Sequence, residues 1–146
     1  MRTGVSQIFT MNTDGANQTM ISKGAGWDDC PSYSADGSKV AFQNSRSGAT
    51  DIWVMNSDGS NPVNLTNGND NHLPTWSPDG NKIAFSSNRD GADRIYTLDA
   101  AGKLQRITSG PGSDSLPNWS PRGNDIVFDR ESDAGTDLFI VHADGT

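Results

Sequence analysis

The sequence predicts an all-β protein made of repeated four-stranded antiparallel units. Three segments share one pattern: PSYSADGSKVAF at 31–42, PTWSPDGNKIAF at 74–85 and PNWSPRGNDIVF at 117–128. Each begins with a proline, and the spacing between prolines is 43 residues in both cases. Apolar residues inside the units recur at every second position, the period of a strand. A repeat in the low forties, with four short strands and no segment of helical period, favours propeller blades over a solenoid.

The first strand of each unit, strand A, follows the proline and carries an aromatic residue, Tyr33, Trp76 or Trp119. A tight turn comes next, as in Ser-Pro-Asp-Gly at 77–80. Proline presets φ, aspartate bonds the local backbone and glycine accepts a positive φ, so this composition predicts a β-turn.

Strands B, C and D complete each unit. Strand B is KVAF, KIAF or DIVF, and strand C, with a central aromatic, is DIWVMN, RIYTLD or DLFIVH at 51–56, 94–99 and 137–142. A second glycine turn, such as Asp58-Gly59, leads into strand D, for example KLQRIT at 103–108. Hairpins therefore join all four strands.

The chain divides into a C-D pair at 1–30, blades at 31–73 and 74–116, and an A-B-C set at 117–146, or about three blades. A closed propeller needs roughly four to eight blades. Open blade faces and unpaired strand edges favour association. We therefore expect a second copy to complete a six-bladed ring as a homodimer. A piece of a longer propeller fits the same ends and is the alternative.

The segment PTWSPDGNKIAFSSNRDG at 74–91 resembles the repeat of the TolB-like β-propellers, relatives of the WD repeat, whose hairpin reads W-S-P-D-G and whose strand B reads I-A-F. The resemblance extends over nearly the whole chain, although Ala35 and Arg122 replace the Pro and Asp of the turn. It implies a non-catalytic scaffold for protein–protein interaction in the periplasm or outside the cell. The accessory propeller of a prolyl-oligopeptidase-like peptidase, or a unit designed or selected for symmetric assembly, remains open.

Composition excludes several classes of function. The net charge of −7 argues against a nucleic-acid partner, because phosphate binding needs a basic surface. No apolar stretch reaches membrane-spanning length, which predicts no membrane insertion, and no secretory apolar region follows Met1. His72 and His142 lie on different elements and no G-x-S-x-G occurs, so we predict no catalytic site, no cofactor and no metal.

Asp28, Asn71 and Asp114 occupy equivalent positions just before strand A. We expect them on the loops that lead into the innermost strands, at one mouth of the central channel. Gathered there, they would attract a cation or the basic segment of a protein partner. The alternative is that they bond backbone N–H groups of their own loops.

Arg46 and Arg89 mark the loop between strands B and C on the same face, where the third unit has Ser132. They are predicted either to contact a partner, since arginine is favoured at interfaces, or to pair with the neighbouring acids. The lone Cys30 aligns with Leu73 and Leu116, which predicts a small buried apolar residue.

Overall fold

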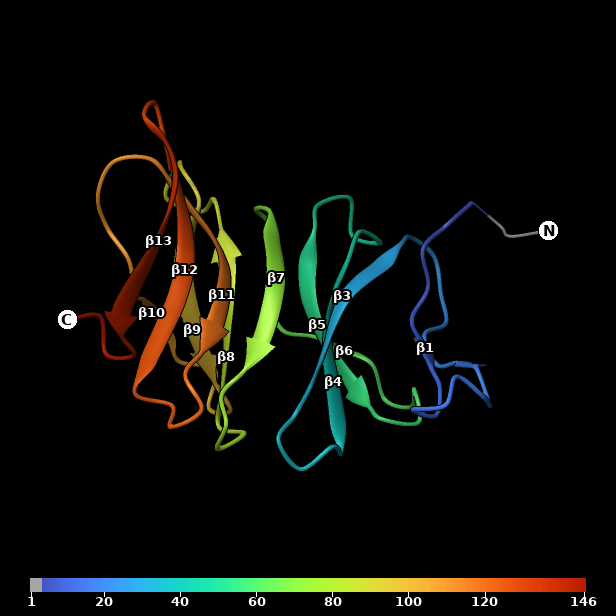
Figure 1. Cartoon of the computed structure of the whole chain (residues 1–146). Coiled ribbons are helices and arrows are strands. Elements are labelled where there is room, and N and C mark those ends of the chain that lie inside the picture. Colours follow the sequence, from blue (N-terminus) through green and yellow to red (C-terminus); the bar gives the residue numbers. More distant parts are fainter. Residues whose placement is uncertain (1–3) are drawn as a thin grey trace.

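The structure is a computed structural model that describes residues 4–146 and is all β over that range, as predicted (Figure 1). Residues 1–3 of the predicted first unit lie outside the described residues. The strands are β1 (Phe9–Thr10), β2 (Thr19–Met20), β3 (Asp28–Tyr33), β4 (Lys39–Asn44), β5 (Asp51–Asn56), β6 (Val63–Asn64), β7 (Asn71–Trp76), β8 (Lys82–Ser87), β9 (Arg94–Asp99), β10 (Leu104–Arg106), β11 (Ser113–Trp119), β12 (Asp125–Ser132) and β13 (Gly135–His142).

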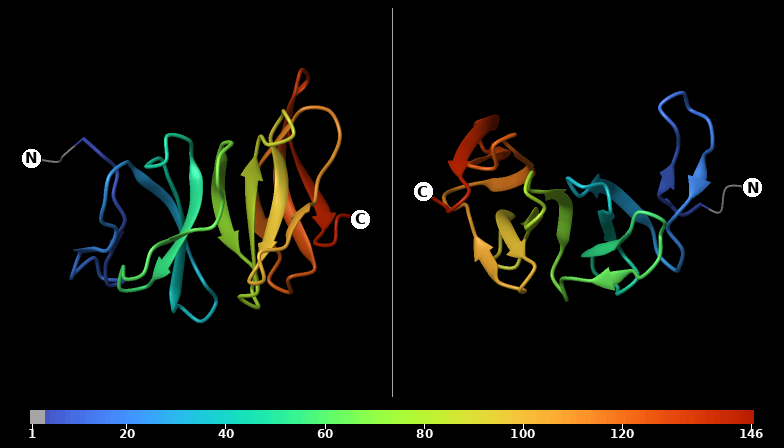
Figure 2. Two further views of the ribbon diagram at one scale, coloured as in Figure 1. Left: turned by 180° about the vertical axis from the view of Figure 1, so that it is seen from behind. Right: turned by 90° about the horizontal axis from the view of Figure 1, so that it is seen from below.

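These strands form four antiparallel sheets that follow one another along the chain. Blade 1 is β1-β2, blade 2 is β3 to β6, blade 3 is β7 to β10 and blade 4 is β11 to β13. Neighbours in each sheet are neighbours in sequence, so every connection within a sheet is a hairpin, as predicted. The blades stand side by side in an open arc, with the two chain ends on opposite sides (Figures 1 and 2).

The first strand of blades 2, 3 and 4 contains a bulge that the repeat pattern did not reveal. Pairing begins before the proline and shifts register at Asp29/Ser32, His72/Thr75 and Ser115/Asn118. The residue before each proline has a positive φ: 50° at Cys30, 57° at Leu73 and 54° at Leu116. A proline cannot donate to the ladder, and the bulge lets the edge strand continue past it.

The bulge also overturns the expectation for Cys30. Its side chain is exposed, not buried, because the residue at a bulge is left out of the regular alternation of the strand. Leu116, at the equivalent position, is likewise exposed, so the apolar character of this position does not reflect burial in the core.

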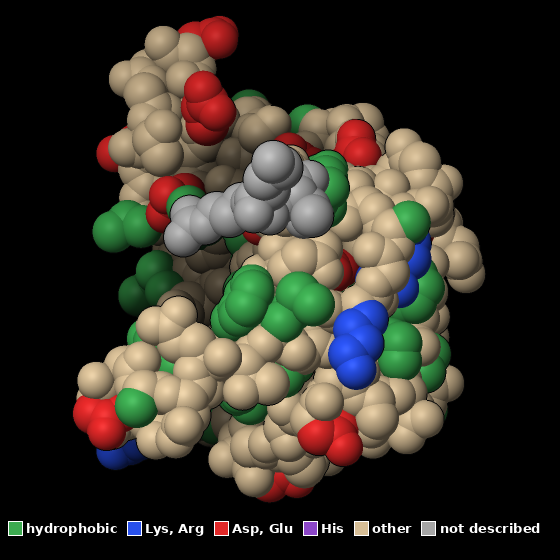
Figure 3. Space-filling model, turned by 90° about the vertical axis from the view of Figure 1, so that its right-hand side faces the viewer, with side chains coloured by type: hydrophobic (Ala, Val, Ile, Leu, Met, Phe, Trp, Pro, Cys, Tyr) green, Lys and Arg blue, Asp and Glu red, His purple; other side chains and the backbone are tan. Residues whose placement is uncertain are grey.

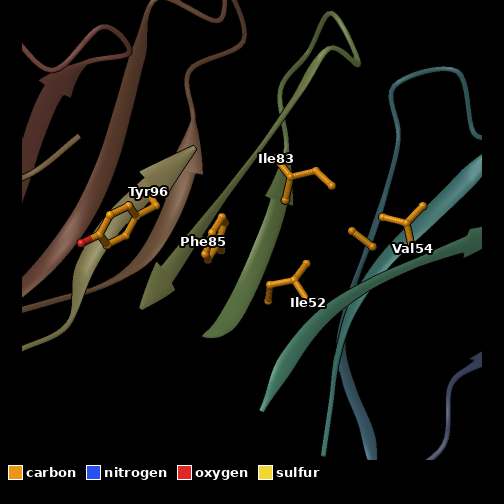
Figure 4. Packing of buried hydrophobic residues seen from close by; sticks show 6 residues of the cluster. Ile52, Val54, Ile83, Phe85 and Tyr96 are labelled. Atoms are coloured by element: carbon orange, nitrogen blue, oxygen red, sulfur yellow. The ribbon is translucent and has the colours of Figure 1, made fainter. Parts of the chain in front are cut away.

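The core consists of three apolar clusters, and each cluster lies in the seam between two blades. Phe85 and Tyr96 of blade 3 face Ile52 and Val54 of blade 2, as Figure 4 shows. The seam between blades 1 and 2 joins Ile8 and Ile21 to Val40, Phe42 and Met55, and the seam between blades 3 and 4 joins Ala84, Ile95 and Ile107 to Trp119, Ile126 and Phe128. Each blade therefore depends on its neighbours for burial, as in other repeat proteins.

Candidate functional site

The structure places Asp28, Asn71 and Asp114 within the first strands rather than on the loops before them. Asp28 opens β3, Asn71 opens β7 and Asp114 is the second residue of β11. All three side chains are almost fully buried. The expected loop position is thus wrong, because the bulge extends each strand past its proline toward the N-terminus.

The backbone of these three residues joins each blade to the one before it. Asp28 N–H donates to Ser6 O at 2.9 Å, Asn71 N–H to Thr50 O at 2.8 Å and Asp114 N–H to Asp93 O at 2.9 Å. The acceptors are themselves equivalent residues that lie directly before the third strand of a blade or its counterpart in blade 1. The same hydrogen bond therefore closes the inner end of every seam.

Asp28 is paired with Arg46 in blade 2. Its Oδ1 accepts hydrogen bonds from Asn44 Nδ2 and from Arg46 Nη2, the latter at 3.2 Å. Asn44 Oδ1 in turn accepts from Arg46 Nε at 2.7 Å. The guanidinium is thereby held over a buried carboxylate by two polar side chains of one sheet.

Asn71 and Arg89 repeat this arrangement in blade 3 with an amide in place of the acid. Arg89 Nη2 donates to Asn71 Oδ1 at 2.7 Å, and Asn71 Nδ2 donates to Gly68 O at 2.8 Å. The Asn71 side chain thus uses both its acceptor and its donor, as a buried amide requires.

Blade 4 has the strongest pair, and its arginine was not predicted. Arg130 donates from Nε and Nη2 to the two carboxylate oxygens of Asp114, at 2.6 and 2.9 Å. These hydrogen bonds raise the pKa of the Arg130 guanidinium above its ordinary value. Arg130 lies two residues before the aligned position, Ser132, so alignment alone missed it. The signal available was an arginine in the third unit within side-chain reach of the same acid.

Each arginine also stacks on the central aromatic residue of strand C in its own blade. The guanidinium carbon is 4.4 Å from the Trp53 ring centroid for Arg46, 4.7 Å from Tyr96 for Arg89 and 5.0 Å from Phe139 for Arg130. Cation–π contacts of this kind contribute about 0.5–1 kcal/mol at exposed sites and more when desolvated. The aromatic residue and the buried acceptor together fix the position of the arginine.

Of the two predictions for the arginines, pairing with a neighbouring acid is observed for Arg46, whereas Arg89 donates to the side chains of Asn71 and Ser87. Asp28 and Asp114 are almost fully buried and are paired with guanidinium groups, so neither presents an exposed carboxylate. Removing one partner of such a buried pair leaves an uncompensated charge and is strongly destabilising. Partner binding by the five predicted residues stays a prediction.

Two further buried polar residues connect the blades, and sequence reasoning did not single them out. The carboxylate of Asp51 accepts from Thr66 Oγ1 at 3.0 Å and from Asn71 Nδ2 at 3.4 Å. At the next seam the aligned residue is Arg94, which donates to Gly110 O and Gly112 O, both at 2.6 Å. Because this position carries an acid in one blade and a base in the next, the sequence did not indicate that Asp51 and Arg94 have equivalent places.

The two histidines lie near different carboxylates. His142 Nδ1 lies 2.6 Å from Asp125 Oδ1, and His72 Nε2 lies 3.8 Å from Asp93 Oδ1. Across residues 4–146, no group of three or more His, Cys, Asp or Glu side chains is arranged to hold a metal ion. The same range contains no helix long and apolar enough to cross a membrane.

The two ends of the row of blades present apolar side chains to solvent. On β13, Leu138 and Ile140 are 75% and 74% exposed, whereas the aligned Ile52 and Val54 of β5 are 1% and 9% exposed. At the other end, Phe9 and Met11 are 59% and 66% exposed. Figure 3 looks onto this N-terminal end, where hydrophobic side chains gather in patches between polar surface. We call these two surfaces the C-terminal and N-terminal end faces.

Solved structures similar to this chain include propellers of several kinds. The structure of a putative TolB from Agrobacterium tumefaciens has a TM-score of 0.89 and 26% identity, over 99% of this chain and 56% of that one. TolB from Acinetobacter baumannii has a TM-score of 0.82 and 25% identity, over 92% of this chain and 34% of that one. The chain thus spans about half of the first structure and a third of the second.

A dipeptidyl peptidase 4 from Porphyromonas gingivalis shares the fold alone, with a TM-score of 0.73 and 16% identity over 95% of this chain and 21% of that one. No curated protein sequence matches the chain. The family described as the TolB beta propeller domain matches residues 1–145, which is nearly the whole sequence. The W-S-P-D-G turn and its two variants, the antiparallel sheets of up to four strands and this match agree, and the chain belongs to the TolB β-propeller family.

Proposed function

We propose that the chain is a non-catalytic propeller scaffold for protein–protein interaction that associates with a second copy of itself through its two end faces. The observation that carries this proposal is the exposure of Leu138 and Ile140, which occupy strand positions that are buried in blade 2. Exposed apolar surface of this kind marks interaction sites.

The end faces are chemically suited to each other. In the seam between blades 2 and 3, Ile52 and Val54 pack against apolar side chains of the following blade. The C-terminal end face offers Leu138 and Ile140 at those positions, and the N-terminal end face offers Phe9 and Met11. Association of the two faces would bury apolar side chains as the internal seams do, at about 25 cal/mol per Å² of apolar surface.

Strand edges support the same association. β13 pairs with β12 on one side, and no described strand pairs with its other edge. An unpaired edge is a template for another strand. Two copies joined head to tail have a two-fold axis, and they supply the six blades expected from the sequence if β2 of one copy pairs with the free edge of β13 of the other, so that blade 4 and blade 1 share one sheet at each junction.

The channel mouth is the proposed contact for a protein or peptide partner. Arg46 and Arg89 lie over Asp28 and Asn71, and the side chain of Arg46 remains 19% exposed. A partner would reach the arginines, while the buried residues, Asp114 included, would act by holding them in place. A pull-down with the double variant Arg46→Ala, Arg89→Ala tests this, and unchanged recovery of the partner would assign the arginines a structural role only.

Two observations support the non-catalytic part of the proposal. The family match is to a propeller domain, and the two histidines lie beside different aspartates on different blades. The likeness to a peptidase at 16% identity concerns the fold and supplies no catalytic residue. Family membership also supports a periplasmic or extracellular location, which cell fractionation of the source organism would test.

The experiment is sedimentation velocity over a range of concentrations. We expect a discrete dimer for the wild-type chain and a monomer for Leu138→Asp, Ile140→Asp, because two buried carboxylates would oppose the interface. Val63→Asp is the matched control, since Val63 is an exposed apolar residue on β6, and it should leave the dimer intact. A wild-type chain that stays monomeric at every concentration would refute self-association.

A further inference from the structure

The seam between blades 2 and 3 differs from the other two seams near the turn that joins the third and fourth strands of a blade. In the seams between blades 1 and 2 and between blades 3 and 4, the glycine of this turn approaches the preceding blade. The glycine is Gly59 in blade 2, and Gly145 holds the equivalent position in blade 4. A Cβ added at Gly59 would collide with Ile21 O, and one at Gly145 would lie 3.4 Å from Ile107 O. A Cβ at the equivalent Gly102 would meet no atom within 4 Å. The turn of blade 3 therefore stands away from blade 2.

This separation leaves a cavity of about 600 Å³ between blades 2 and 3. Polar turn residues line part of it, and both blades contribute apolar side chains: Val54, Leu65, Trp76, Ile83 and Leu98. Leu65 is only half-buried, whereas the aligned Ile107 of the next seam is 5% exposed. Cavities of about 300–1,000 Å³ with mainly apolar walls are typical of small-molecule sites.

The tryptophan in the wall has an unmet hydrogen-bond donor. Trp76 Nε1 is buried and has no acceptor among the described residues, whereas the aligned Trp119 donates from Nε1 to Thr75 O at 3.3 Å. A buried donor without a partner costs about 1–3 kcal/mol. Trp76 thus lacks the hydrogen bond to the preceding blade that Trp119 makes.

The rim of the cavity is acidic. Asp36, Asp79 and Asp99 line it together with a single basic residue, Lys39. The hydroxyl of Ser34 donates to Asp36 and lowers the pKa of that carboxyl to about 2, and the hydroxyl of Ser77 lowers the pKa of Asp79 in the same way. Both carboxylates therefore keep their charge at any physiological pH, and the rim favours a cation.

We propose that this inter-blade cavity binds a small organic cation with an apolar or aromatic body, such as an arylalkylamine. The body would occupy the space between Leu65, Trp76 and Leu98, and the ammonium group would lie among the carboxylates of the rim. The site is independent of the end faces and of the channel mouth. Its selectivity for cations is modest, because charges at an exposed rim are screened by water and salt.

The test compares two probes of similar size and opposite charge, phenethylamine and 3-phenylpropionate, by NMR of the ¹⁵N-labelled chain. The indole signal of Trp76 is assigned by its loss in Trp76→Phe. We expect phenethylamine to shift this signal and leave that of Trp119 in place, with a Kd at least about threefold lower than that of 3-phenylpropionate at low salt. The difference should shrink at high salt, as screening requires.

Three variants complete the experiment. Leu65→Phe fills the cavity and should abolish the shift, while Asp36→Asn, Asp79→Asn should weaken phenethylamine several-fold and leave 3-phenylpropionate unchanged or tighter. Asp144→Asn removes a turn carboxylate outside the cavity and should change neither. Equal affinity for the two probes at low salt, equal shifts of Trp76 and Trp119, or no shift at tens of millimolar phenethylamine would overturn the proposal.

Discussion

Strands β5 and β13 hold the same place in their blades and have opposite surroundings. Ile52 and Val54 on β5 are covered by blade 3, whereas Leu138 and Ile140 on β13 meet solvent. Residue type and spacing are alike in the two strands, so the burial of a strand is decided by the neighbouring blade rather than by its own sequence. The energetic unit of this molecule is therefore the seam between blades, in agreement with the nearest-neighbour behaviour of repeat proteins.

The largest expected effect comes from truncating a buried side chain on β9, compared with the same truncation at the aligned position of β13. Ile95→Ala should lower the free energy of unfolding by about 3 kcal/mol, because Ile95 is fully buried in the seam between blades 3 and 4. Leu138→Ala, at the aligned position of β13, should cost less than about 0.5 kcal/mol in dilute solution. Urea unfolding at low protein concentration measures both values.

Equal costs for the two variants would show that the burial seen in the seams does not govern stability. If the chain dimerises as proposed, the cost of Leu138→Ala should rise with protein concentration while that of Ile95→Ala changes little.

The next effect compares two of the buried arginine pairs, in blade 4 and in blade 2. Arg130→Ala should lower the free energy of unfolding by about 2 kcal/mol, because it removes both hydrogen-bond donors from the buried carboxylate of Asp114 and leaves only Arg94 Nη1 nearby, at 3.9 Å. Arg46→Ala should cost about 1 kcal/mol, because Asn44 still donates to Asp28 after the change. Thermal or urea unfolding of the two variants tests the order, and a larger loss for Arg46→Ala would contradict it.

The smallest expected effect is on the pH dependence of stability. It distinguishes the turn of blade 2, which contains Asp36, from the turn of blade 4, where Arg122 replaces the aspartate. Since the folded-state pKa of Asp36 is about 2, below the ordinary value of about 3.9, its contribution to stability is present above pH 4. That contribution is lost as the pH falls toward 2. Asp36→Asn should therefore flatten the dependence of unfolding free energy on pH between 4 and 2, and Arg122→Asn should leave it unchanged.

Urea titrations at several pH values provide the measurement. A slope that Asp36→Asn leaves as steep as in the wild-type chain would show that the hydrogen bonds from Ser34 and Ser38 do not stabilise the ionised form.

Much of the fold could be predicted because its signals are local. The period of two and the repeated turn composition depend on neighbouring residues, and they placed strands such as β5 and β9 at their observed bounds. The first strands were placed too late in the chain, because the bulge at Cys30, Leu73 and Leu116 interrupts the alternation that reveals a strand.

The candidate site was predictable only where aligned residues make the same contacts in each blade. Asp28, Asn71 and Asp114 were found by alignment, but Arg130 was not, because a long side chain can reach the same acceptor from a different position of its strand. The cavity beside Trp76 gives no sequence signal at all. The aligned segment around Trp119 is nearly the same, yet the turn glycine and the indole N–H meet the preceding blade there and do not at Trp76.

The inner-end hydrogen bonds from Asp28, Asn71 and Asp114 have a consequence for how such chains change length. Each bond uses the same pair of aligned backbone positions, so excising or duplicating one whole unit would leave a matched donor and acceptor at the new junction. Deleting a single residue between the two partners of one bond would disturb that bond, whereas both partners of every later bond lie downstream and keep their spacing. Gain or loss of complete units is therefore a route by which an array like this one becomes longer or shorter with all of these bonds kept.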